Sequence, residues 1–154
     1  MNIFVVDRDP IVAAQQLCDK HVVKMILETA QMLCTVAHQQ GFNAPYKVAH
    51  PKHPCTLWAG KSAENWDWLV THGLAMSKEY TRRYGRVHKS EEVIKWCARL
   101  PLGFPEKGLT PFAQAMPEQY KNPCVVTAYR AYYHGEKAPF ATWKSEVPQW
   151  WTTA

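Results

Sequence analysis

The sequence predicts an all-α protein, and three observations carry this expectation. Apolar residues recur in steps of three and four over residues 10–40 and again over 57–84, which is the period of a helix. Cap residues stand at the ends of these segments, and prolines separate them. The chain has 154 residues, of which 47% are apolar, so it can form one sizeable hydrophobic core. We expect a compact single-domain bundle (1–154) of two long and two or more short helices with Pro-rich loops.

The first long helix is expected over about residues 10–40. Asp9 and Pro10 form a favourable N-cap and first-turn pair, and Gly41 supplies a left-handed C-cap. Residues 3–6 precede this helix as a short, extended apolar segment. We expect this segment to lie against the helices.

The second long helix is expected over about residues 57–84, with Gly85 as its C-terminal stop. Residues 42–57 contain three prolines and predict a loop before it. A short third helix is expected over 90–100. Ser90 is its N-cap, and two glutamates occupy its first turn, where the helix dipole favours acidic side chains.

Five prolines between residues 101 and 123 predict irregular structure. A fourth helix is expected to begin at residue 122 or 123 and to close at Gly135. The segment 140–151 is too aromatic for a free linker, so we expect it to pack back onto the helices.

Composition excludes several classes of protein. Eighteen Lys and Arg against 13 Asp and Glu give a net charge of +5, which favours polyanionic partners. No apolar run approaches the roughly 20 residues of a membrane helix, so a soluble, cytoplasmic protein is expected. The five cysteines include no Cys-x-x-Cys pair, which argues against a disulfide framework or a zinc ribbon. Motifs for nucleotide cofactors and serine hydrolases are missing, and no cofactor is expected.

One face of the first helix combines a base, an amine and a carboxylate. His21, Lys24, Glu28 and Gln31 lie within one stripe at helical spacing. As an active-site face, the stripe offers Glu28 for proton transfer and Lys24 for phosphate binding or nucleophilic attack. The alternative is a solvated helix surface with an intrahelical Lys-Glu pair.

Two segments interleave basic and aromatic residues, a pattern that suits contacts with phosphates and stacked bases. The alternatives are stabilisation of a helix C-terminus by cations for the first segment and an aromatic core stripe for the second. The first segment contains Tyr80, Arg82, Arg83, Tyr84, Arg86, His88 and Lys89, and the second contains Tyr129, Arg130, Tyr132, Tyr133, His134, Lys137, Trp143 and Lys144.

A third candidate is the segment 50–55, which places His50, His53 and Cys55 close together. This group could begin a metal site, but the sequence offers no matching second half. A structural or DNA-facing loop is the favoured interpretation.

The chain resembles the pyrimidine-dimer DNA glycosylases of the endonuclease V type, as a divergent, phage-type member. The resemblance rests on short pieces spread over most of the chain. These are Gln16-Leu17 through Lys24, His53-Pro54 followed by Trp58-Ala59-Gly60, Glu79-Tyr80-Thr81-Arg82-Arg83-Tyr84-Gly85, and Ala128-Tyr129-Arg130-Ala131-Tyr132-Tyr133 with Lys137 and Phe140.

The resemblance implies a compact helical fold that binds double-stranded DNA. It also implies removal of a damaged pyrimidine by an N-terminal α-amine through an imine, followed by β-elimination at the abasic site. In two places the chain departs from the family pattern. The family's Arg-Glu pair falls on Val22-Val23, so Glu28 is expected to substitute, with His21 and Lys24 as electrostatic partners. Asn2 is bulky and should leave Met1 in place, whereas the family usually exposes a trimmed second residue.

We therefore expect a monomeric DNA glycosylase with abasic-site lyase activity. Met1 is the expected nucleophile and Glu28 the acid or base, with His21 and Lys24 beside them. A non-enzymatic nucleic-acid-binding phage accessory protein is the first alternative, and a metal-dependent hydrolase at His21, His50, His53 and Cys55 is the second. The expected nucleic-acid contacts are His53, Arg82, Arg83, Arg86, Arg130 and Lys137, and Lys24 is a further phosphate contact.

Overall fold

The first long helical segment is interrupted in the computed structural model, which describes residues 1–152. The segment 10–40, expected as one helix, forms α1 (Pro10–Gln16) and α2 (Asp19–Gln39). Leu17 and Cys18 lie between the two helices in extended backbone conformations. The expectation of one continuous helix was therefore wrong at this joint.

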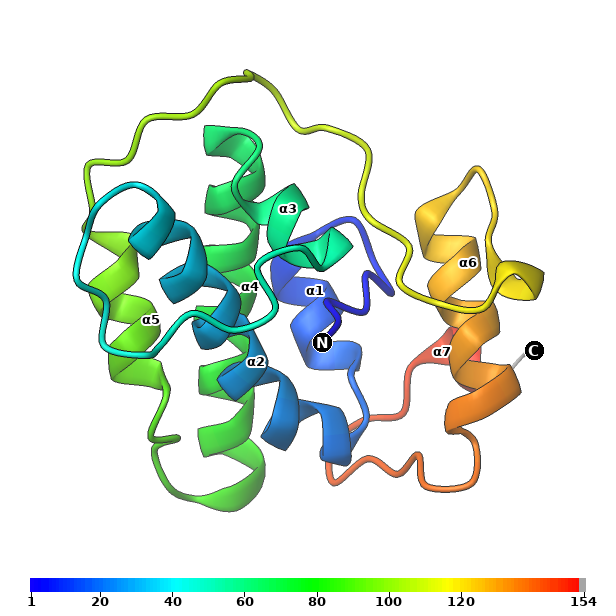
Figure 1. The fold of residues 1–154 in the computed structure, drawn as a ribbon. Coiled ribbons are helices and arrows are strands. Elements are labelled where there is room, and N and C mark those ends of the chain that lie inside the picture. The colour runs from blue at the N-terminus through cyan, green and yellow to red at the C-terminus, as the bar shows by residue number, and fades with distance from the viewer. Residues whose placement is uncertain (153–154) are drawn as a thin grey trace.

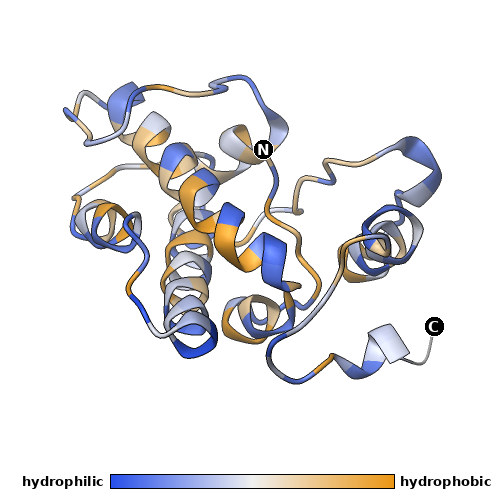
Figure 2. Cartoon of the chain, turned by 90° about the horizontal axis from the view of Figure 1, so that it is seen from below, coloured by the Kyte–Doolittle hydropathy of each residue, from blue (hydrophilic) through white to orange (hydrophobic). Residues whose placement is uncertain are grey.

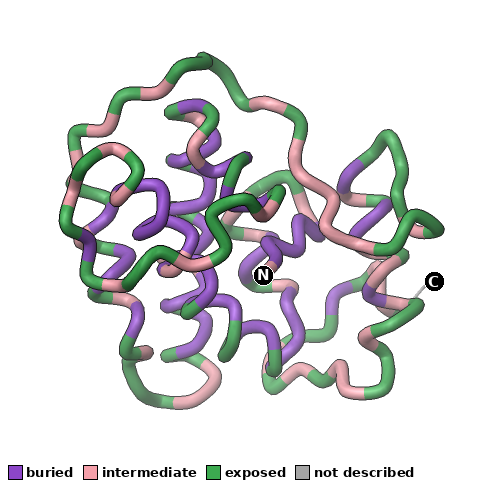
Figure 3. The backbone as a smooth tube through the Cα atoms, in the orientation of Figure 1, coloured by how far each residue is buried: buried purple, intermediate pink, exposed green. Residues whose placement is uncertain are grey.

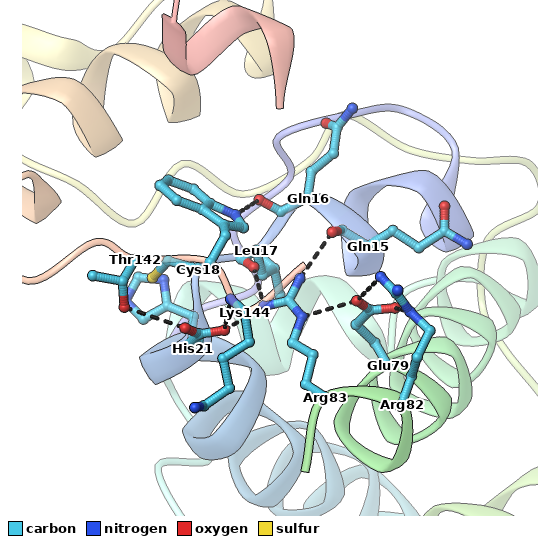
Figure 4. A network of polar contacts seen from close by, with 12 residues as sticks. Gln15, Gln16, Leu17, Cys18, His21, Glu79, Arg82, Arg83, Thr142 and Lys144 are labelled. Carbon is cyan, nitrogen blue, oxygen red and sulfur yellow. Dashed lines mark hydrogen bonds and ion pairs between the residues drawn. The ribbon is translucent and has the colours of Figure 1, made fainter. Parts of the chain in front are cut away.

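Hydrogen bonds from distant residues explain the joint between α1 and α2. A helix end leaves backbone carbonyls without intrahelical partners. Arg83 donates to the carbonyl oxygens of Gln15 and Leu17 at 3.0 and 2.8 Å, as Figure 4 shows. The indole nitrogen of Trp143 donates to the carbonyl oxygen of Gln16 at 2.9 Å. Because these donors are remote in sequence, local periodicity cannot predict the break.

The second long segment is also divided. It forms α3 (Pro54–Ala59) and α4 (Ala63–Tyr84). The residue before α4, Ser62, has an extended backbone, and its hydroxyl accepts a hydrogen bond from the amide of Asn65 at 3.0 Å. This side-chain cap satisfies one of the free amides of a new helix start, so α4 begins after the joint.

Three helix ends lie where the sequence predicted them. The side chain of Asp9 accepts hydrogen bonds from the amides of Ile11 and Val12 at the start of α1. Gly41 and Gly85 follow α2 and α4 with φ angles of 89° and 70°, the left-handed conformation that favours glycine.

The other helical elements are short. The third and fourth expected helices are present, but they end earlier than predicted. The fourth stops at Tyr132, and a π-helical turn carries the chain past Gly135. No strand forms in residues 1–152, so the all-α prediction is confirmed. In chain order the elements are α5 (Glu91–Ala98), a 3₁₀ turn (Glu118–Tyr120), α6 (Val125–Tyr132), the π-helical turn (Tyr133–Lys137) and α7 (Gln149–Thr152).

Helix α4 is the centre of the packing, because α1, α2, α3 and α5 all contact it (Figure 1). Orange and blue residues alternate along the long helices in Figure 2, as expected for amphipathic helices. The segment 3–6 is fully buried, as predicted, and Figure 3 shows it in purple together with much of α2 and α4. The connection over 99–124 crosses the surface as an exposed and half-exposed chain.

The aromatic tail packs back, as expected from the sequence. The carboxylate of Asp19 accepts hydrogen bonds from the Thr142 hydroxyl at 3.2 Å and from the backbone amide of Lys144 at 2.9 Å. The indole nitrogen of Trp150 donates to the side chain of Gln16 at 3.0 Å. These bonds attach the tail to α1 and α2. None of the helices in the described residues has the length and apolar character needed to cross a membrane.

Candidate active site

The N-terminus of the chain lies against α2. The α-ammonium nitrogen of Met1 is 2.9 Å from Oε1 of Glu28. The side chain of Lys24, one helical turn earlier and exposed, places its Nζ 4.0 Å from Oε2 of the same carboxylate. Glu28 is buried, so its carboxylate interacts with the terminal amine in a partly dehydrated setting.

These groups line a pocket of about 310 Å³ that opens between α2 and the C-terminal part of the chain. Three lysines, Lys20, Lys24 and Lys137, line the pocket together with a single carboxylate, that of Glu28. The pocket is therefore cationic and suits an anionic ligand.

Aromatic rings form one wall of the pocket. The rings of Phe4 and His21 stack with centroids 4.0 Å apart and an interplanar angle of 19°. Tyr132 lies nearly parallel to Phe4, with centroids 6.2 Å apart. Phe140 meets the edge of His21 at 5.7 Å. Such a wall offers flat surfaces against which a nucleobase can stack.

His21 is buried in this wall. Its Nδ1 forms a hydrogen bond with the hydroxyl of Tyr133. Burial, with further contributions from Lys137 and Lys24, lowers the pKa of His21 to about 3. The imidazole is therefore neutral at physiological pH, and it lines the same pocket as Glu28 as an uncharged polar ring.

The two other lysines of the pocket lie over its aromatic rings. Nζ of Lys137 is 4.6 Å from the ring centroid of Tyr132 and 5.6 Å from that of Phe4. Nζ of Lys20 is 4.6 Å from the centroid of Phe140. Cation–π contacts restrict where these ammonium groups lie, so they occupy defined positions around the pocket.

The pocket thus combines an amine, a carboxylate, stacking rings and cations. An α-amine is the most easily deprotonated aliphatic amine of a protein, and a neighbouring carboxylate can accept its proton. The neutral amine is then a nucleophile for an electrophilic carbon. Aromatic faces can hold a base and lysines can hold phosphates.

The four residues predicted as catalytic, Met1, His21, Lys24 and Glu28, all line this pocket. Among the predicted nucleic-acid contacts, Lys137 also lines it. The stripe on the first helix is therefore not a fully solvated surface, because Glu28 and His21 are buried.

The other predicted nucleic-acid contacts lie outside the pocket. The ring Nδ1 of His53 caps α3 by accepting from the amide of Cys55. Burial, and after it the nearby terminal ammonium, lowers the pKa of His53. Arg82 is 61% exposed and pairs with Glu79 at 2.7 Å. Arg86 donates to the hydroxyl of Tyr80. Arg130 donates to the carbonyl of Val6, pairs with Asp7 at 3.7 Å and lies over the ring of Trp150.

Arg83 differs from its neighbour Arg82. Its side chain is 1% exposed and forms ion pairs with Asp19 at 3.2 Å and with Glu79 at 2.8 Å. It also holds the carbonyls at the α1–α2 joint, so its guanidinium is occupied within the fold (Figure 4). This side chain therefore has no free surface to offer a phosphate.

The histidine loop does not assemble a metal-ligand cluster. Across residues 1–152, no group of three His, Cys, Asp or Glu side chains is placed to hold a metal ion. Burial raises the pKa of the Cys55 thiol to about 12, so the thiolate that binds metals is disfavoured. His53 uses its Nδ1 for the helix cap.

Sequence reasoning did not assign four lining residues to the site: Asn2, Phe4, Lys20 and Met25. Lys20 had a signal, because it stands one turn before Lys24 on the same helix face. Asn2 and Phe4 had none, since their positions depend on the path of the N-terminal segment, and Met25 belongs to the apolar pattern of the first helix.

The residues at the family's Arg-Glu positions lie away from the pocket lining. Val22 is buried in the core, and Val23 is exposed on α2. The carboxylate that meets the amine belongs to Glu28, five residues after Val23. The chain therefore retains a glutamate beside the N-terminus.

The pocket of this all-helical chain brings together an amine, a carboxylate, three lysines and stacking rings, a set of groups that suits contact with phosphates and bases. The family profile described as pyrimidine dimer DNA glycosylase matches residues 1–92, more than half of the chain. The chain belongs to this family. Neither the curated proteins nor the solved structures gave a match.

Proposed function

We propose that the protein is a monomeric DNA glycosylase with abasic-site lyase activity, acting on a damaged or modified pyrimidine in double-stranded DNA. The observation that carries this proposal is the 2.9 Å contact between the Met1 amine and Glu28 inside a cationic, aromatic-walled pocket. Membership of the pyrimidine dimer DNA glycosylase family supports a pyrimidine in DNA as the substrate.

In the first step Glu28 accepts a proton from the Met1 ammonium, and the freed lone pair attacks C1′ of the target nucleotide. The bond from C1′ to the base breaks, and its electron pair leaves with the base, which takes up a proton. The C1′–O4′ bond then opens to give an imine between C1′ and Met1, with O4′ protonated. Glu28 is the group placed to carry these protons, because it contacts the amine directly.

The lyase step breaks the DNA strand from the same imine. A base removes a proton from C2′, the electron pair of the C2′–H bond forms a C2′=C3′ double bond conjugated with the imine, and the 3′ phosphate leaves from C3′ with the electron pair of the C3′–O bond. Water then hydrolyses the imine and regenerates the amine. Lys24 lies beside this carboxylate, with its Nζ 4.0 Å from Oε2 of Glu28.

We assign the DNA contacts to two groups of side chains. Lys20, Lys24 and Lys137 at the pocket are placed for the phosphates that flank the target nucleotide. The surface residues His53, Arg82, Arg86 and Arg130 are candidates for phosphates further along the duplex. Arg83 is left out of this group because it is buried in ion pairs.

The test is covalent trapping with borohydride, which reduces an imine to a stable amine. Duplexes carrying a cyclobutane dimer, an abasic site or no lesion are incubated with the protein, and adducts are separated on a denaturing gel. The expected adduct maps to the peptide that begins with Met1 and disappears when the α-amine is blocked. Salt-sensitive binding without an adduct on any lesion would instead favour the non-enzymatic DNA-binding alternative.

A further inference from the structure

Asn2 is a polar residue that the fold buries, with only 7% of its surface exposed. Its Oδ1 accepts hydrogen bonds from the amides of Ile3 at 2.8 Å and of Phe4 at 3.3 Å. Its Nδ2 donates to the carbonyl oxygen of Ala115 at 2.8 Å. A buried amide with this many partners fixes the local backbone firmly, because each lost bond would leave a buried polar group unpaired.

A second side chain completes this arrangement. The hydroxyl of Tyr129 lies 2.9 Å from Oδ1 of Asn2 and 3.0 Å from the carbonyl oxygen of Ala113, and it accepts from the amide of Ala115 at 3.2 Å. Burial raises the pKa of Tyr129 well above its usual value, so the hydroxyl keeps its proton. We call Asn2, Tyr129 and the segment 113–115 the N-terminal clamp.

The clamp lies next to an unusual stretch of backbone. Phe4 has a φ of 58°, in the left-handed region that is costly for residues with a Cβ atom. This turn lets the Phe4 ring stack on His21. On the other side of the clamp, the Met1 side chain is only 3% exposed and its amine contacts Glu28. The clamp therefore fixes both the amine and one aromatic wall of the pocket.

We infer that Asn2 is a positioning residue, which holds the α-amine of a retained Met1 against Glu28. This inference rests on the proposed function for its catalytic meaning. A chain that began at Asn2 would move the amine by one residue, about 3.8 Å along the backbone, and would lose the buried Met1 side chain. The reactive amine is thus that of Met1. The family resemblance implied instead the amine of a second residue, exposed after removal of the first.

The clamp also gives the C-terminal part of the chain a role in the site. Ala113, Ala115 and Tyr129 lie outside the segment 1–92 that matches the family. The pocket residues Lys137 and Phe140 also lie outside it. Elements beyond the matched segment therefore help to hold the N-terminus and complete the pocket lining.

The first test needs no DNA. Intact mass establishes whether Met1 is present, and reductive methylation with formaldehyde, read out by peptide mass spectrometry, gives the reaction rate of the α-amine. The variants are Asn2→Leu, which has no hydrogen-bonding side chain, and Tyr129→Phe, which loses only the hydroxyl. Tyr46→Phe is the matched control, because it removes a hydroxyl that bonds to Ser90 away from the clamp.

We expect the α-amine to react about fivefold faster in Tyr129→Phe and about tenfold or more faster in Asn2→Leu, since each clamp bond restrains the segment that holds the amine against Glu28. Tyr46→Phe should match the wild type. Tyr129→Phe keeps the buried ring, so it can still test the clamp if Asn2→Leu fails to fold. Absence of Met1, or equal rates in all four proteins, would overturn the inference.

The second test separates this inference from the proposed function. The borohydride-trapping rate is measured against pH for the same proteins. A positioning role predicts at least about tenfold slower trapping in Asn2→Leu together with a changed pH profile, and little change in DNA affinity. Trapping at the wild-type rate and with the wild-type pH profile would refute the clamp and leave the glycosylase proposal standing. A wild-type protein that never forms an adduct would refute the proposed function. The methylation rates would still show whether the clamp restrains the α-amine.

Discussion

Replacing Arg83 by methionine should destabilise the protein far more than the same change at Arg82. The Arg83 side chain is 1% exposed and donates to Glu79 at 2.8 Å, to Asp19 at 3.2 Å and to two backbone carbonyls at the α1–α2 joint. Removing one member of a buried ion pair leaves an uncompensated charge and costs about 3–5 kcal/mol. Arg82 is 61% exposed, and loss of an exposed pair costs about 1 kcal/mol or less.

Urea unfolding, followed by far-UV circular dichroism and tryptophan fluorescence, measures both effects. We expect the midpoint of Arg83→Met to fall well below that of the wild type, and that of Arg82→Met to change little. DNA binding tests the same distinction. Arg82→Met should lower the slope of log affinity against log salt by about 0.9 if this residue contacts a phosphate. Equal unfolding midpoints for the two variants would refute the structural role of Arg83.

Three further predictions concern packing, pH and DNA contacts. Gly73→Ala should destabilise the protein by about 1–2 kcal/mol in urea unfolding, because a Cβ atom there would lie 2.9 Å from Thr29 and 3.0 Å from Ile94, and this overpacking outweighs the gain in helix propensity. Burial lowers the pKa of His72 from 6.5 to about 4, so the unfolded chain binds a proton that the folded chain does not. Stability should therefore be highest above about pH 6.5 and fall as the pH approaches 4, with about 3 kcal/mol of the loss due to His72 and a further loss due to the buried His21. His72→Phe should remove the first part of this dependence; an unchanged pH profile of thermal unfolding would contradict it. Lys24→Gln should lower the salt slope of DNA binding by about 0.9 in fluorescence anisotropy, and an unchanged slope would remove this lysine from the phosphate contacts.

The sequence predicted the helix ends that depend on local chemistry. Asp9 caps α1 through bonds to amides two and three residues later, and Gly85 ends α4 through its own backbone conformation. The joint at Leu17 and Cys18 depends on Arg83 instead, which is 66 residues away from the carbonyl it holds. Local sequence patterns therefore predict helix caps well. They cannot predict a helix break that is stabilised by hydrogen bonds from residues distant in the sequence.

The candidate site follows the same division. Helical spacing alone brought His21, Lys24 and Glu28 to one face, and the structure places all three in one pocket. The contact between Met1 and Glu28 could not be predicted in this way, because it depends on the path of the N-terminal segment, which the clamp determines. The burial of individual side chains could not be deduced from the sequence either. Burial gives Arg83 a structural role that the exposed Arg82 lacks, and it keeps His21 neutral.

Borohydride trapping of the wild type and of Glu28→Gln on a cyclobutane-dimer duplex and an abasic-site duplex tests the central claim most directly. The account predicts a wild-type adduct on the peptide that begins with Met1. It also predicts at least about a hundredfold slower adduct formation by Glu28→Gln, with DNA affinity largely unchanged, because the variant loses the proton acceptor beside the amine. An adduct on a lysine, or equal trapping by the two proteins, would contradict the assignment of Met1 and Glu28 as the reacting pair.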